Sequence, residues 1–102
     1  MMHRNDFLIN ELENTLYELR DIMYNKLFQK DFVDLEKSIE IVKQKHINQL
    51  YMIDVKIQNF VRLLYETGIL RDIDNEVYDI IIRHIDKINY LLKNIIENQY
   101  DT

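Results

Sequence analysis

Three histidines, His3, His46 and His84, are the side chains in this chain best suited to acid–base chemistry or metal binding. Metal sites built on a helix place a second ligand three or four residues from a histidine, as in the HExxH and ExxH patterns. No two of these histidines are three or four residues apart, and no glutamate stands three residues before one of them. The spacing of the histidines therefore predicts no helical metal site.

The other residue types that carry chemistry give the same result. Cysteine is absent, which excludes disulfides and thiolate zinc sites. Glu36 and Glu40 share a helix face, but such pairs are typical of a solvated surface. The single glycine, Gly68, excludes a glycine-rich phosphate loop, and no Ser–His–acid motif is recognisable. We expect no catalytic residue, no metal and no cofactor.

The segment around His84 nevertheless resembles a phosphotransfer motif. In "RHIDKINYL", Asp86, Asn89 and Leu91 match the R-H-D-x-x-N-x-L phosphoacceptor pattern of one group of sensor histidine kinases. This resemblance implies phosphotransfer through His84. Because Ile85 is inserted between the histidine and the aspartate, His84 is turned by about 100° on a helix, into the apolar arc. We therefore predict a partly buried structural histidine, and phosphotransfer is the alternative.

A second resemblance covers about a third of the chain. The segments "LYELRDIMYNK" and "DLEKSIEIV" are similar to the helical hairpin of small aspartyl-phosphate phosphatases that regulate sporulation. Those proteins carry a Ser-Gln-Glu-Leu-Asp motif on the second helix, where this chain has "KSIEI". Phosphatase-like signalling thus belongs to the same alternative as phosphotransfer, without site residues of its own.

The elements that must position all these residues are helices. Proline is absent and glycine occurs once in 102 residues, and these two residue types make most tight turns and β-hairpins. At about 100° per residue, apolar side chains form a continuous arc in three segments, about residues 6–29, 32–67 and 74–99. Gly68 stands where a helix C-terminus favours a left-handed residue, and Asp74 can cap the last helix. We predict one all-α domain over residues 1–102, an antiparallel three-helix bundle with a long central helix.

An alternative for the central helix stays open. Its apolar stripe runs from Leu35 to Leu64 without losing phase, which favours a single helix over residues 32–67. The polar stretch "VKQKHINQ" could instead end one helix and start the next. A break near residues 44–48 would give a four-helix bundle, a common architecture at this chain length.

Charge and hydropathy limit the partners of the chain. The formal net charge is −5 and the isoelectric point about 5.1, which disfavours binding to nucleic acid or an anionic membrane. No apolar run approaches the roughly 18 residues of a transmembrane helix, and the N-terminal segment has no signal-peptide core. We expect a cytoplasmic protein without a membrane partner, and a small nucleic-acid-associated dimer is a further alternative.

Apolar residues outside the core stripes predict an interface. They are Tyr17, Tyr24 and Phe28 in the first helix and, spaced by eleven residues in the central helix, Ile41, Met52 and Leu63. Single surface apolar residues are normal, but aromatic and methionine clusters mark binding surfaces. A central helix of about 54 Å would also extend beyond the shorter helices beside it, which would leave part of its apolar face uncovered. These features predict a homodimer or a complex with a protein partner, formed by a non-catalytic interaction module that acts as a small regulator, inhibitor or assembly subunit.

Overall fold

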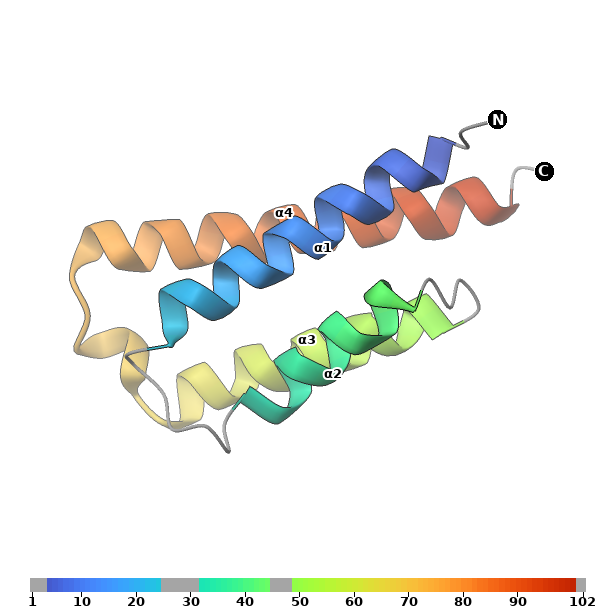
Figure 1. Cartoon of the computed structure of the whole chain (residues 1–102). Helices are drawn as coiled ribbons and strands as arrows, with labels where there is room; N and C mark the ends of the chain where they lie inside the picture. Colours follow the sequence, from blue (N-terminus) through green and yellow to red (C-terminus); the bar gives the residue numbers. More distant parts are fainter. Residues whose placement is uncertain (1–3, 25–31, 45–48, 101–102) are drawn as a thin grey trace.

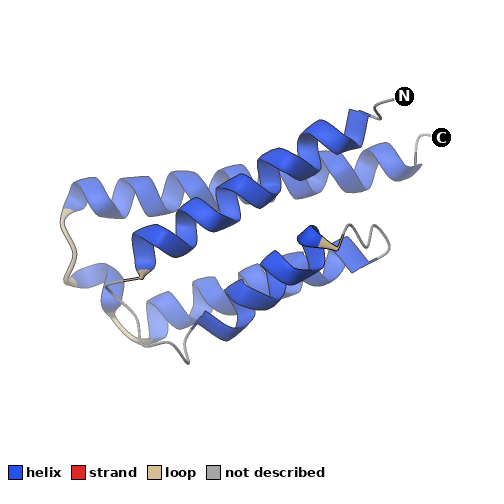
Figure 2. Cartoon of the chain, in the orientation of Figure 1, coloured by secondary structure: helices blue, strands red, loops and turns tan. Residues whose placement is uncertain are grey.

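The part of the chain that the structure describes folds into four α-helices. The structure, a computed structural model, describes residues 4–24, 32–44 and 49–100. The elements are α1 (Arg4–Met23), α2 (Val33–Lys43), α3 (Leu50–Glu66), a short 3-10 helix η3 (Ile69–Arg71) and α4 (Asn75–Tyr100). Within these residues every regular element is helical, as Figure 2 shows. The all-α prediction is confirmed.

The four helices form an antiparallel bundle in which α1 lies beside α4 and α2 lies beside α3 (Figure 1). Contacts between α1 and α2 and between α3 and α4 join the two pairs. Each helix runs antiparallel to its neighbours. The start of α1 and the end of α4 therefore lie at the same end of the bundle (Figure 1). The bundle measures 45 × 25 × 18 Å along its principal axes.

The predicted single helix over residues 32–67 is wrong, and the alternative with a break near residues 44–48 is correct. α2 ends at Lys43 with Gln44 as its C-cap, and α3 begins at Leu50 and runs back along α2. The apolar stripe keeps its phase because both helices face the same core. The phase of the apolar residues shows which face of a helix is buried. It does not show whether the next helix continues in the same direction or runs back.

This correction removes one argument for a dimer. A helix of about 54 Å would have left apolar surface that shorter neighbours could not cover. α2 and α3 instead cover each other, and α1 and α4 complete the enclosure. Dimerisation stays a prediction that must rest on other surfaces.

The other helix boundaries agree better with the predictions. α4 extends over Asn75–Tyr100, against the predicted 74–99, and α1 starts at Arg4 but ends at Met23, earlier than the predicted 29. Residues 25–31 lie outside the described part of the chain. Asp74 occupies the N-cap position of α4, and its carbonyl oxygen accepts a hydrogen bond from the backbone N–H of Tyr78 at 2.9 Å.

All four helices contribute side chains to one core. The fully enclosed members include Leu12, Leu16 and Leu19 of α1, Leu35 of α2, Ile53, Ile57, Phe60 and Leu64 of α3, and Ile81, Ile88 and Ile95 of α4. Two small polar residues are buried with them. Thr15 Oγ1 donates to the carbonyl oxygen of Glu11 at 2.7 Å, and Ser38 Oγ donates to that of Asp34 at 2.9 Å. Because both hydroxyls are hydrogen-bonded, their burial leaves no unsatisfied donor.

Gly68 ends α3 in the predicted left-handed conformation. Its φ is +71°, and its N–H donates to the carbonyl oxygen of Tyr65 at 3.2 Å, as in a Schellman-type C-cap. Ile69 follows and packs against the core. The chain then turns through η3 into α4, so the single glycine sets the direction of the connection between the last two helices.

We expect Gly68→Ala to destabilise the protein by about 1–2 kcal/mol, which is the cost of a left-handed backbone for a residue with a Cβ. A Cβ at this position would meet no atom within 4 Å, so a steric clash adds nothing to that cost. Chemical denaturation measures the loss directly. Gly68→Asn is the matched control and should lose less, because asparagine tolerates this conformation better. Equal stability of Gly68→Ala and the native protein would contradict the assignment.

Candidate functional site

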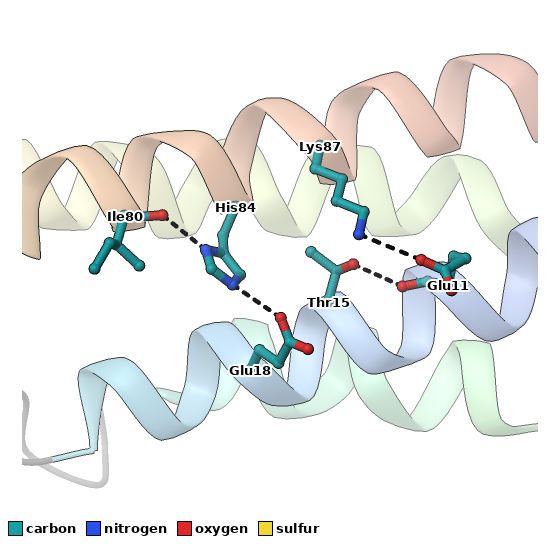
Figure 3. A network of polar contacts seen from close by, with 6 residues as sticks. All are labelled: Glu11, Thr15, Glu18, Ile80, His84 and Lys87. Atoms are coloured by element: carbon teal, nitrogen blue, oxygen red, sulfur yellow. Dashed lines mark hydrogen bonds and ion pairs between the residues drawn. The ribbon is translucent and has the colours of Figure 1, made fainter.

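His84 lies in the seam between α1 and α4, where both of its ring nitrogens have partners (Figure 3). Nδ1 is 2.7 Å from the carbonyl oxygen of Ile80 and must donate there, because a carbonyl oxygen only accepts. Nε2 is 3.0 Å from Oε2 of Glu18 on α1. The ring of His84 therefore bridges the two helices, with one nitrogen on each.

The surroundings of His84 do not favour phosphotransfer. Its side chain is 20% exposed, which agrees with the predicted partly buried position, and neither ring nitrogen is free for an incoming phosphoryl group. Farther along the same seam Lys87 pairs with Glu11, at 3.3 Å between Nζ and Oε2 (Figure 3). These contacts read as a polar seam that fixes α1 against α4. Across the residues that the structure describes, no group of acidic, histidine or cysteine side chains could hold a metal ion. His3 and His46 lie outside those residues.

The predicted interface residues Tyr17 and Tyr24 of the first helix lie in different surroundings. Tyr17 packs against the core, and the guanidinium of Arg20 lies 4.9 Å from the centre of its ring. Arg20 also reaches Glu36 of α2 at 3.6 Å, so this side of α1 faces α2. Tyr24 is 60% exposed, but its ring stacks on the buried ring of Phe32, with 6.4 Å between the centroids.

Phe28 lies outside the described residues. Tyr17 is covered by the core, so it does not form part of a free surface. Among the described residues of the predicted aromatic face, only Tyr24 is mostly exposed to solvent.

The predicted line Ile41–Met52–Leu63 does not exist as one line, since it required a continuous helix. Ile41 belongs to α2 and packs against the core, whereas Met52 and Leu63 belong to α3 and are half-buried. Met52 and Leu63 lie on the same side of α3 as Lys56, whose Nζ is 3.8 Å from Oδ1 of Asp34 on α2. This flank of α3 is thus turned towards α2 and partly covered.

Three of the large apolar residues that are exposed lie on the outer face of α3. Tyr51, Val55 and Tyr65 are 60%, 50% and 57% exposed. With the exposed Asp54, Gln58 and Arg62 they lie within about 100° of arc on the helix. We call these six residues the α3 stripe: Tyr51, Asp54, Val55, Gln58, Arg62 and Tyr65.

The α3 stripe differs from the other exposed apolar residues in its continuity. Phe7 and Val33 are isolated on α1 and α2, and Ile80 and Tyr90 stand ten residues apart on α4. Along α3, by contrast, Tyr51, Val55, Gln58, Arg62 and Tyr65 follow a four-three-four-three spacing. That is the spacing with which one helix packs along another. The eleven-residue spacing of the predicted interface residues does not include the α3 stripe, whereas the four-three spacing of its residues does indicate it.

No helix in the described part of the chain is long and apolar enough to cross a membrane. Comparison of the chain with protein-family models, with curated proteins and with solved structures finds no match.

Proposed function

We propose that the protein is a non-catalytic interaction module that binds a protein helix along the outer face of α3. The observation that carries this proposal is the exposure of Tyr51, Val55 and Tyr65 on one face of a helix whose opposite face is fully buried. Tyrosine is a frequent anchor at interfaces, because it buries a large area and loses little rotamer freedom. Such a module would act as a regulator, an inhibitor or an assembly subunit.

The supporting frame for this face is rigid. Ile53, Ile57, Phe60 and Leu64 hold α3 against the core, and Lys56 links its flank to Asp34 of α2. A helix fixed in this way presents its outer residues in one geometry, so a partner does not have to bear the cost of ordering it. This is the helix-in-groove or helix-on-helix mode of recognition.

Site-specific photocrosslinking tests the proposal. A benzoylphenylalanine residue placed at position 51 or 65, in the protein expressed in its native host, should yield covalent adducts with another polypeptide. Position 90 is the matched control, because Tyr90 is 66% exposed but lies on α4. Adducts from positions 51 and 65 with few from position 90 are the expected result. Adducts of equal yield at all three positions, or at position 90 alone, would show that the α3 stripe is not the binding surface.

A further inference from the structure

The charged and aromatic residues of the α3 stripe are arranged symmetrically in position and oppositely in charge about its centre, so the stripe is complementary to a second copy of itself. Gln58 is at the centre of the stripe, with Asp54 and Arg62 four residues away on either side, and Tyr51 and Tyr65 seven residues away. A two-fold axis through Gln58 therefore sets each aspartate level with an arginine and each tyrosine level with a tyrosine. A surface with this order is self-complementary in charge and in shape, as an isologous dimer requires.

The aspartate and the arginine at the centre of this order are available. Both are exposed, and within the residues that the structure describes neither forms an ion pair or a side-chain hydrogen bond with the rest of the chain. The ion pairs of Arg20, Lys56 and Lys87, by contrast, link helices within the bundle, as does the contact of His84 with Glu18. Asp54 and Arg62 on α3 are therefore available to charged groups of a partner.

From this order we infer that the occupant of the α3 stripe is a second copy of this chain, paired antiparallel through α3 about Gln58. The inference rests on the proposed function and adds the partner and the geometry to it. Asp54 of each copy faces Arg62 of the other, so the dimer contains two equivalent intermolecular ion pairs. Tyr51 of each copy lies level with Tyr65 of the other, which places an aromatic pair at both ends of the contact.

A parallel pairing of the same faces is disfavoured by the same charges. It would set Asp54 against Asp54 and Arg62 against Arg62, and like charges in contact across an interface cost several kcal/mol. The direction of pairing is therefore part of the inference. Since one helical stripe is smaller than a standard interface of about 1,600 Å², the association is weak and belongs to the range from micromolar to millimolar.

Charge reversal on the two positions gives the decisive experiment. Sedimentation equilibrium of the native chain, at concentrations up to about 1 mM, should show a monomer–dimer equilibrium. Asp54→Arg alone and Arg62→Asp alone each create two like-charge contacts, and each should weaken the dimer at least about tenfold. An equimolar mixture of the two variants restores both opposite-charge contacts between unlike chains, so a heterodimer of near-native affinity should form. The double variant Asp54→Arg/Arg62→Asp should regain a homodimer.

Matched controls separate this effect from general charge and from misfolding. Asp79→Arg and Arg83→Asp reverse an exposed aspartate and an exposed arginine on α4, and they should leave association unchanged. Circular dichroism and melting temperature should be native for all variants. Rescue by mixing cannot occur if either variant is unfolded, so folding is tested by the same measurement.

Three results would overturn the inference. The first is a native chain that remains a monomer at every concentration. The second is a dimer whose affinity is unchanged by either single charge reversal. The third is a mixture of the two variants that forms no heterodimer. None of them would remove the proposed function, because adducts of the α3 stripe with a different protein would still appear in the photocrosslinking experiment. Conversely, adducts absent from positions 51 and 65 would remove the proposed function together with this inference.

Discussion

Phe60→Ala is expected to destabilise the bundle by about 3–5 kcal/mol, the range measured when a buried aromatic side chain is cut back to a methyl group. Phe60 is among the largest of the fully buried side chains, and it stands in the middle of α3. Since a domain of this size has a stability of roughly 5–15 kcal/mol, this single change would remove a large share of it. Thermal and chemical denaturation followed by circular dichroism give the loss.

Tyr65→Ala is the matched control for this prediction, because it removes another aromatic side chain from the same helix. Tyr65 is 57% exposed, so its removal should change the free energy of unfolding of the monomer by less than about 0.5 kcal/mol. Both variants should be compared at low protein concentration, where association adds nothing to stability. A loss below about 1 kcal/mol for Phe60→Ala would be too small for a core position and would show that α3 does not pack as described.

A short bifunctional thiol cross-linker should join Asp34→Cys to Lys56→Cys within one chain in high yield. The native side chains of these residues meet at 3.8 Å between α2 and α3. In one continuous helix the same positions would be roughly 33 Å apart, beyond the reach of a short linker. The chain has no native cysteine, so the reaction is specific to the two new thiols. Mass spectrometry identifies the product as one chain plus one linker.

The control pair for cross-linking is Asp34→Cys with Gln58→Cys. Gln58 is two residues from Lys56, but it belongs to the outer face of α3, turned by about 200° around the helix. We expect little intramolecular product from this pair. Equal yields from both pairs, or a product with the mass of two chains only, would contradict the α2–α3 hairpin.

The sequence predicted the core more accurately than the connections. The apolar arcs predicted at the helical period contain Leu12, Leu16, Ile57, Phe60 and Ile88, and all five are enclosed. The reason is physical, because a helix that packs on one side must repeat its apolar residues at the helical period. A residue in a connection obeys no such period, so the burial of Phe32 before α2 and of Leu70 in η3 follows from packing and not from periodicity.

The preferred single helix over residues 32–67 is wrong for a related reason. Periodicity gives the angle of a residue around a helix axis but contains no information on the direction of that axis. Leu35 and Leu64 stay in phase although α2 and α3 run in opposite directions. The signal for the correct alternative, a break near residues 44–48, was the mostly polar composition of residues 43–49.

For the candidate site, the sequence did not show which apolar residues outside the main arcs are exposed. Tyr17 and Ile41 lie outside the main apolar arcs and were predicted to form an interface, yet both pack against the core. A helix with two neighbours buries a wider arc than a helix with one. Only the packing of the four helices shows which apolar residues outside the central stripe are covered, and which, like Tyr51 and Tyr65, are left over.

The pairing of α1 with α4 has a consequence for the order in which the bundle assembles. Among the described residues these two helices make the most extensive contacts, although α1 leaves the ribosome well before α4. The α2–α3 hairpin joins neighbouring segments and can close early, because a short loop costs little entropy. Until α4 has been synthesised, the leucine face of α1 has only α2 to cover it. A nascent chain that stops before α4 should therefore bind chaperones and aggregate, and completion of α4 should release it into the folded state.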